Sequence, residues 1–207
     1  MEREFRDAAG YGHERIASGM RIVTERLVVR PLQDSDVPDL LEYLSAGDPM
    51  IERVMGLTPS REAIVKYWQP MHSINPYEDD PEWLSLLIEL ASEEKVVGNI
   101  GFGIRAIDSQ HKHGSIGWAL SPFYRGRGIA TEAATSMLDF LFRVRRLHRV
   151  QARTGRGNAP SWRLMERLGM RREAHFRGSH TDLDGMWADE FVYAILRCEW
   201  ATRGREA

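Results

Sequence analysis

The sequence has a single cysteine. Because Cys198 is the only thiol among 207 residues, the chain cannot close a disulfide within itself. Extracellular proteins often depend on disulfides, so their absence fits a reducing compartment. Cys198 lies in the apolar run FVYAILRCEW, which predicts a buried structural residue rather than a reactive one.

Long apolar runs and a strong net charge are also missing. No stretch approaches the roughly 20 apolar residues that span a bilayer, and the charged N-terminus lacks the apolar segment of a secretory signal. The formal net charge is −2, whereas dedicated nucleic-acid binders are usually strongly basic. We expect a soluble cytoplasmic protein with no membrane contact. The basic runs RGRG, RVRR (143–146) and GRG (155–157) keep RNA binding as a weaker alternative.

No internal repeat or low-complexity linker divides the chain. Residues 1–20 mix charge, glycine and alanine without a period, which predicts a loosely ordered N-terminal extension before a single domain at 21–207. Apolar patterning predicts strands at 26–32, 83–90, 96–105, 114–121, 149–154, 171–180 and 186–197, and helices at 37–47, 60–71, from about 127 for four turns, and 158–170. This order predicts an α+β fold: a mixed, largely antiparallel sheet of about seven strands flanked by about four helices.

Polar residues stand where these helices should begin. Asp34 or Ser35 can cap the first helix, Ser60 the second and Asn158 the last, because their side-chain oxygens can accept from free backbone N–H groups. Gly47 is placed to end the first helix.

The stretch SPFYRGRGIATEA (121–133) places Gly126 and Gly128 between arginines, just before a helix. Two interpretations remain open at this point. Bare backbone at a helix N-terminus, with the charges of Arg125 and Arg127, would cradle a phosphate or pyrophosphate. Alternatively, the glycines only shape a tight turn between strand and helix.

The same stretch resembles a known family. Arg125, Gly128 and Ala130 stand at the fixed positions of the R/Q-x-x-G-x-G/A motif of the GNAT superfamily of N-acetyltransferases. TERLVVRPLQDSDVPDLLEYL, VVGNIGF, GSIGWALSPFYRGRGIATEA and NAPSWRLMERLGMRREA resemble further segments of its RimJ/RimL-like branch, in the same order, over roughly residues 22–200. The resemblance implies a GNAT fold and an enzyme that transfers an acetyl group from acetyl-CoA to a primary amine, either a protein N-terminus or a small amine.

The resemblance also implies a set of site residues. The main-chain N–H of Leu120 would stabilise the oxyanion, Ser161 would be the acid beside the CoA sulfur, and Phe123 would lie near the cofactor. No metal is implied, and related proteins are often dimers. The implied cofactor-binding residues are Leu120, Ser121, Arg125, Gly126, Arg127, Gly128, Ile129, Ala130, Asn158 and Ser161.

Two residues common in the family are absent. Ser115 stands where many members have a glutamate base, and Met165 stands where many have a tyrosine acid. Without a strong base, an amine of low pKa is the better acceptor, which favours an N-terminal α-amine over a lysine side chain. The departures also support an alternative: an acyl-CoA-binding sensor or interaction module without transferase activity. Candidate replacement bases are Glu89, Asp189 and Glu190, each of which also has a structural interpretation.

Three further features have two interpretations each. His111 and His113 invite a metal site, but two histidines without a third ligand favour a surface loop. The acidic loop YEDDPEW could attract a cationic acceptor or simply be solvated. The aromatic residues Tyr67, Trp68 and Trp83 could line an acceptor pocket, although we favour a place in the core.

Overall fold

The computed structural model describes residues 4–6, 12–16, 19–46, 59–108, 111–182 and 184–203. Its centre is one sheet in the order β1-β2-β3-β4-β5-β6-β7-β8-β10-β9. Every neighbouring pair is antiparallel except β7 and β8, which are parallel. The strands are β1 (Glu4–Arg6), β2 (Gly12–Ile16), β3 (Gly19–Val23), β4 (Leu27–Arg30), β5 (Leu84–Leu90), β6 (Lys95–Ala106), β7 (Lys112–Leu120), β8 (Arg149–Gly155), β9 (Arg171–Thr181) and β10 (Trp187–Leu196).

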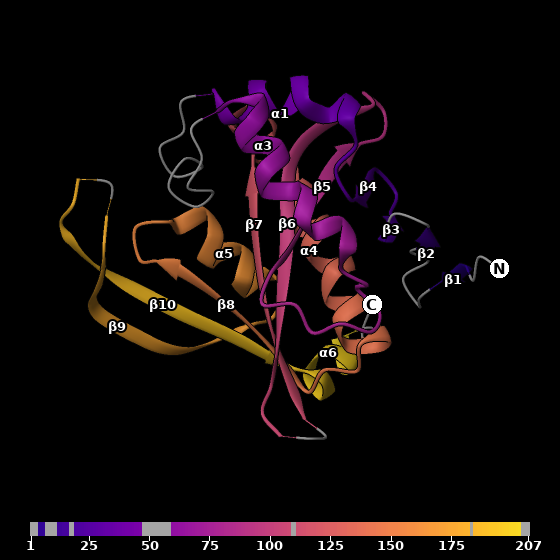
Figure 1. The fold of residues 1–207 in the computed structure, drawn as a ribbon. Helices are drawn as coiled ribbons and strands as arrows, with labels where there is room; N and C mark the ends of the chain where they lie inside the picture. The colour runs from indigo at the N-terminus through magenta and orange to yellow at the C-terminus, as the bar shows by residue number, and fades with distance from the viewer. Residues whose placement is uncertain are drawn as a thin grey trace.

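Helices cover both faces of this sheet (Figure 1). The α-helices are α1 (Val37–Leu44), α3 (Arg61–Trp68), α4 (Ile129–Asp139), α5 (Ala159–Arg167) and α6 (Arg197–Arg203). Shorter turns are η1 (Asp34–Asp36), η2 (Gln69–Ser73), η3 (Pro122–Tyr124) and the π-helical η4 (Phe140–Val144). The predicted α+β fold class is therefore confirmed.

Side-chain alternation along the strands separates two cores. Leu86 and Ile88 of β5 belong to the cluster that packs under α4 and α5. Leu87, between them in sequence, belongs to the cluster under α1 and α3. Because successive strand side chains point to opposite faces, we call these the α4/α5 face and the α1/α3 face.

The sheet is larger than the predicted seven strands. The structure has β1, β2 and β3 in the region where a loosely ordered extension was predicted, and they pair antiparallel at one edge. Met20 and Ile22 of β3 are fully buried, but three apolar residues in a five-residue run give too short a pattern for a sequence-based assignment.

The C-terminal end also differs from the prediction. Strand β10 ends at Leu196, and α6 begins at Arg197. Cys198 therefore lies on a helix and is exposed, so the prediction of a buried cysteine is wrong. The apolar run that suggested burial belongs to the strand, whereas the cysteine follows it.

Two of the three predicted helix caps are correct. Ser60 accepts from the N–H of Ala63 at the start of α3, and Asn158 accepts from the N–H of Ser161 at the start of α5. The cap at Asp34 or Ser35 is wrong, because those residues lie in η1 and Asp36 is the N-cap of α1. Gly47 lies outside the described residues.

Candidate active site

Strands β7 and β8 separate soon after they meet. Their parallel pairing covers only His113–Ser115 against Arg149–Gln151. Figure 1 shows the two strands together near the bottom of the view and diverging upward, with α5 beside the opening. The sheet is thus interrupted at its centre, where a ligand can reach main-chain groups that an intact sheet would pair.

The register of β6 and β7 shows which groups face this opening. Ser121 donates its N–H to the carbonyl of Val97, and Leu120 lies opposite Gly98. In an antiparallel pair, hydrogen-bonded and non-hydrogen-bonded positions alternate, so the N–H and C=O of Leu120 point away from β6, toward β8. The carbonyl accepts from Nε of Arg125 at 3.1 Å.

A cavity of about 1200 Å³ lies at the separation of β7 and β8. Ser115, Tyr67 and Trp83 line it from the α1/α3 face, and Ser161 and Met165 line it from α5. Because one cavity has walls from both faces of the sheet, two molecules could meet in it from opposite sides. Leu120, Ser121 and the loop 125–130 do not line it.

The loop after β7 has the backbone conformation that glycine favours. Gly126 has φ 76° and Gly128 has φ 79°, both in the left-handed region. Side-chain space differs between them: a Cβ on Gly126 would meet nothing within 4 Å, whereas one on Gly128 would lie 3.3 Å from a guanidinium nitrogen of Arg26. The turn explains why glycine stands at both positions, and it leaves the backbone of Gly126 exposed.

The same loop leaves donors at the start of α4. Gly128 is the N-cap and supplies no side-chain hydrogen bond. Among the described residues, no atom accepts a hydrogen bond from the main-chain N–H groups of residues 126–130. Such groups, together with the positive end of the helix dipole, bind anions. The exposed guanidinium of Arg127 lies 5.1 Å from the ring centroid of Tyr124, at the same end.

Arg26, which directly precedes β4, holds this loop in place by hydrogen bonds. Its Nη1 donates to the carbonyl of Arg127 at 2.9 Å, and its Nε donates to Glu132 at 2.7 Å. Glu132 also accepts from the hydroxyl of Thr24 at 2.5 Å. The acidic side chain in the first turn of α4 is thus paired by a cation, and the loop is tied to the sheet. Sequence reasoning missed Arg26, because it lies about a hundred residues from the motif.

Asn158 and Ser161 lie together at the start of α5. The amide oxygen of Asn158 accepts from the N–H of Ser161 at 3.3 Å, so Asn158 acts as a helix cap. Both residues and Met165, which is buried, line the cavity. Ser161 is half-buried, and among the described contacts its hydroxyl forms no hydrogen bond.

The three candidate bases differ in position. Glu89 lies outside the cavity lining and pairs with Arg30 at 2.6 Å. Asp189 and Glu190 line the cavity. Hydrogen bonds from His175 and from the N–H of Gly178 lower the pKa of Asp189.

Both of these cavity-lining carboxylates already form ion pairs. Asp189 lies 3.4 Å from Nη1 of Arg156 and 2.6 Å from Nε2 of His175, and Glu190 lies 2.5 Å from Arg153. A carboxylate held by a cation is a weak proton acceptor. Their geometry therefore favours a structural role at the β9–β10 hairpin.

The three aromatic residues separate into two groups. Trp68 is 1% exposed and belongs to the core of the α1/α3 face. Tyr67 and Trp83 line the cavity, so the predicted place in the core is wrong for Trp83, whose exposed fraction is 37%. Burial raises the pKa of Tyr67, and the neighbouring Ser85 hydroxyl offsets part of that rise.

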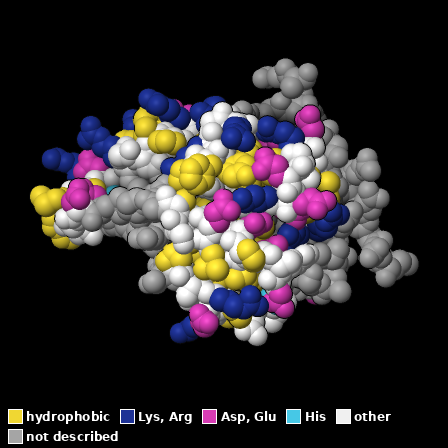
Figure 2. All heavy atoms as spheres, turned by 90° about the horizontal axis from the view of Figure 1, so that it is seen from above, with side chains coloured by type: hydrophobic (Ala, Val, Ile, Leu, Met, Phe, Trp, Pro, Cys, Tyr) yellow, Lys and Arg dark blue, Asp and Glu magenta, His cyan; other side chains and the backbone are white. Residues whose placement is uncertain are grey.

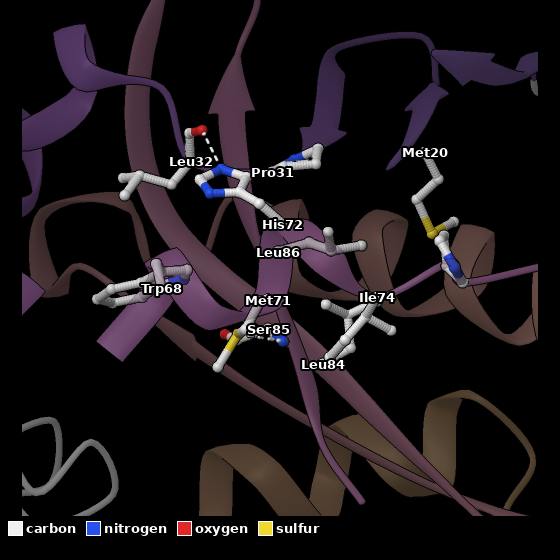
Figure 3. Close-up of a pocket in the computed structure, with 11 residues that line it drawn as sticks. Met20, Pro31, Leu32, Trp68, Met71, His72, Ile74, Leu84, Ser85 and Leu86 are labelled. Atoms are coloured by element: carbon white, nitrogen blue, oxygen red, sulfur yellow. Dashed lines mark hydrogen bonds between the residues drawn. The ribbon is translucent and has the colours of Figure 1, made fainter. Parts of the chain in front are cut away.

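A second pocket lies between η2, β5 and the chain after β4 (Figure 3). Its volume of about 10 Å³ is close to that of a single water molecule. His72 faces the carbonyl of Leu32 there, with Nε2 at 2.9 Å, and the indole N–H of Trp68 has no partner among the described atoms. This space is too small for a substrate.

The charged runs noted in the sequence pair with each other. Asp80 of the acidic loop lies 2.8 Å from Arg145 and 2.6 Å from Lys112, and Arg143 pairs with Asp139 at 2.8 Å. Asp80 thus anchors the acidic loop beside η4, while Trp83 at the end of that loop lines the cavity. These ion pairs engage two arginines of the RVRR run, which weakens the RNA-binding alternative.

The remaining polar candidates give no metal centre. His111 pairs with Asp108 at 2.9 Å, and burial and the charge of Arg149 lower the pKa of His113. Across the described ranges, no group of three or more His, Cys, Asp or Glu side chains could hold a metal ion. Among these same residues, no helix is long and apolar enough to cross a membrane.

The β9–β10 hairpin projects from the sheet (Figure 1). Near its tip, Met186 and Trp187 are 67% and 75% exposed. Figure 2, the view from above, shows hydrophobic side chains at the corresponding left end, and acidic and basic side chains interspersed over the rest of that face.

The site thus combines an interrupted α+β sheet, uncapped helix amides beside the interruption and a cavity with walls from both faces. The chain belongs to the GNAT acetyltransferase family: it matches the family model described as Acetyltransferase (GNAT) domain over residues 26–171. Its relatives and this domain indicate an N-acetyltransferase.

Two curated relatives illustrate the range of the family. The uncharacterized N-acetyltransferase YnaD of Bacillus subtilis is 32% identical over 87% of this chain and 99% of its own length. The ribosomal protein uS5-alanine N-acetyltransferase of Escherichia coli is 24% identical over 94% of this chain and 100% of its own length, which places this chain among the relatives of the RimJ/RimL branch.

Solved structures share the fold. A GNAT-family acetyltransferase from Bacillus anthracis superposes with a TM-score of 0.71 at 30% identity, over 87% of this chain and 100% of that chain. The RimL ribosomal alpha-N-protein acetyltransferase, solved in complex with coenzyme A, has a TM-score of 0.70 at 20% identity, over 84% of this chain and 96% of that chain.

Proposed function

We propose that this protein transfers the acetyl group of acetyl-CoA to a primary amine by direct attack on the thioester, and that its best acceptor is the α-amine of a polypeptide. The observation that carries the proposal is the uncapped start of α4 beside the separation of β7 and β8. GNAT acetyltransferases use acetyl-CoA, and a structural neighbour was solved with coenzyme A. We further propose that residues 21–207 act as one catalytic domain in the cytoplasm.

The start of α4 fits a pyrophosphate. The N–H groups of 126–130 are free of acceptors among the described residues, Gly126 presents bare backbone, and Arg127 adds positive charge. Ile129 is buried and Ala130 packs against the core, so these two residues would contribute their main chain. Arg125 would help indirectly, because it holds the carbonyl of Leu120.

Leu120 and Ser161 would act on the reacting atoms. The N–H of Leu120 points into the opening and has no acceptor among the described residues, so it would donate to the thioester oxygen as negative charge develops there. The Ser161 hydroxyl would give a proton to the departing thiolate. The proton lost by the amine would pass to water, because Ser115 is no base and Asp189 is held by His175.

The chemistry of the acceptor favours an α-amine. At pH 7 an α-amine with a pKa of about 7.7–8.0 is about one tenth unprotonated, whereas a lysine amine near 10.4 is almost wholly charged. A site that has no strong catalytic base therefore works best on the acceptor amine of lower pKa. The E. coli relative is named for an alanine of ribosomal protein uS5, and the RimL neighbour is named an alpha-N-protein acetyltransferase, which agrees with this class.

The test is release of free thiol from acetyl-CoA with a panel of N-terminal peptides, polyamines, aminoglycosides and amino acids. Release with peptides bearing a free α-amine, and its loss when that amine is blocked, supports the proposal. Binding of acetyl-CoA without release for any acceptor would instead support a binding module, the alternative that Ser115 and Met165 suggest.

A further inference from the structure

The indole of Trp83 packs against main chain at three glycines. It lies over Gly101, Gly103 and Gly117, which we call the glycine bed. A Cβ on Gly101 would lie 2.7 Å from two indole carbons, and a Cβ on Gly117 would lie 3.1 Å from another. Gly101 and Gly117 are direct partners across β6 and β7. The ring therefore fills the place that two paired strand side chains would otherwise occupy.

The ring lies on the acceptor side of the cavity. Gly103 of the bed is the direct partner of Ser115, and Asn99 on the same face bonds to Tyr43 of α1 at 3.0 Å. The bed therefore belongs to the α1/α3 face, whereas the free amides of α4 and Ser161 of α5 belong to the other face. An amine that meets the thioester between β7 and β8 would arrive past Trp83.

The cavity wall around the ring carries a second aromatic side chain. Tyr67 of α3 lines the cavity from the same face, whereas Trp118 of β7 packs against the core of the α4/α5 face. The cavity's acidic side chains come from the β9–β10 hairpin and its turn. Of these, Asp189 pairs with Arg156 and Glu190 with Arg153. The acceptor side of the wall thus presents the rings of Trp83 and Tyr67, and Asp182 and Asp184 are the lining carboxylates that have no ion pair among the described contacts.

We propose that Trp83 is the specificity-determining residue of the acceptor site, and that its exposed face contacts the first side chain of a polypeptide acceptor. An apolar first side chain would cover the indole, whereas an acidic one would lose hydration against the ring and face the carboxylates of the hairpin turn. This inference rests on the proposed function.

The test compares peptides that differ only in their first residue: alanine, leucine or aspartate. For the wild-type protein we expect kcat/KM to be at least tenfold higher with alanine or leucine than with aspartate. Trp83→Ala should reduce this preference to within threefold while the Kd of acetyl-CoA changes less than twofold. The matched control is Phe176→Ala, which removes a 47% exposed aromatic side chain outside the cavity lining and should keep the preference.

A smaller change probes the bed itself. Gly117 has no positive φ, and its new methyl group would contact only the indole of Trp83, so Gly117→Ala should shift the ring and leave the sheet folded. We expect a severalfold rise in KM for the apolar peptides and an unchanged Kd for acetyl-CoA.

The outcomes separate this inference from the proposed function. An unchanged first-residue preference in folded Trp83→Ala, or a wild-type preference for aspartate, would overturn the role of Trp83 while leaving transfer to peptides intact. Failure of the wild-type protein to acetylate any peptide would overturn the proposed function itself.

Discussion

Helices α4 and α5 begin beside the same opening in the sheet but begin differently. At α5, Asn158 supplies a side-chain oxygen to the N–H of Ser161. At α4, Gly128 supplies none, and the N–H groups of 126–130 have no acceptor among the described residues. A capped start stabilises its own helix, whereas an uncapped one keeps its donors for a ligand. Under the proposed function, α4 would be the anion-binding end and α5 would position a side chain.

The largest expected effect comes from blocking the uncapped end. Gly128→Val places a branched side chain at φ 79°, 3.3 Å from Arg26, where a pyrophosphate would approach. We expect the affinity for acetyl-CoA, measured by calorimetry, to fall at least 100-fold. Circular dichroism identifies folded protein, and normal acetyl-CoA binding by folded Gly128→Val would show that α4 is not the binding end.

The next effect concerns the side chain that α5 positions. Ser161→Ala removes the hydroxyl that would protonate the thiolate, and general acids typically contribute about 10²–10⁴-fold. We expect kcat to fall about 100-fold, while the Kd of acetyl-CoA stays within about twofold. An unchanged kcat would show that Ser161 is only a structural residue in the first turn of α5.

We expect Arg26 to affect only the binding of acetyl-CoA at the uncapped start of α4. Arg26→Gln frees the carbonyl of Arg127 and leaves the Glu132 carboxylate without a cation beside the incoming phosphates, although Thr24 still donates to it. Loss of a charged hydrogen-bond partner costs about 1.5–3 kcal/mol, so we expect a weakening of acetyl-CoA binding of about tenfold or more.

A second variant isolates the charge in this prediction. Combining Arg26→Gln with Glu132→Gln removes the unpaired carboxylate and should restore part of the affinity in a double-mutant cycle. Additive losses would mean that Glu132 acts independently of Arg26.

The smallest effect comes from removing a true cap. Asn158→Ala should destabilise the fold by about 1 kcal/mol, seen as a fall in Tm of about 2–4 °C. Ser60→Ala removes the cap of α3, far from the cavity lining, and should cost a similar amount with no change in kcat. A far larger loss of acetyl-CoA affinity in Asn158→Ala than in Ser60→Ala would mean that Asn158 also contacts the ligand.

Local patterns in the sequence account for most of the fold. The strands at 84–90, 95–106 and 112–120 and the caps Ser60 and Asn158 all lie within two residues of their predicted positions. These elements depend on alternation and on neighbours a few residues away, which a sequence displays directly. The short β3 and the exposed Cys198 were missed, because burial there depends on which strand lies alongside.

The site was less accessible to such reasoning. The motif placed the glycines at the start of α4, but nothing near it signals that Arg26 would reach Glu132 across 106 positions of chain. The glycine bed under Trp83 is likewise assembled from two strands, β6 and β7. Contacts of this kind are set by packing after the sheet has formed, so only the three-dimensional structure brings them together.

A cavity with walls from both faces of the sheet has a kinetic consequence. If the thioester enters beside α4 and the amine enters past Trp83, neither blocks the path of the other. Both reactants can then be held at once, and neither needs to leave before its partner arrives. Double-reciprocal plots of steady-state rates at several concentrations of both substrates would give intersecting lines, which indicate a ternary complex. An enzyme that forms an acetylated intermediate would give parallel lines instead.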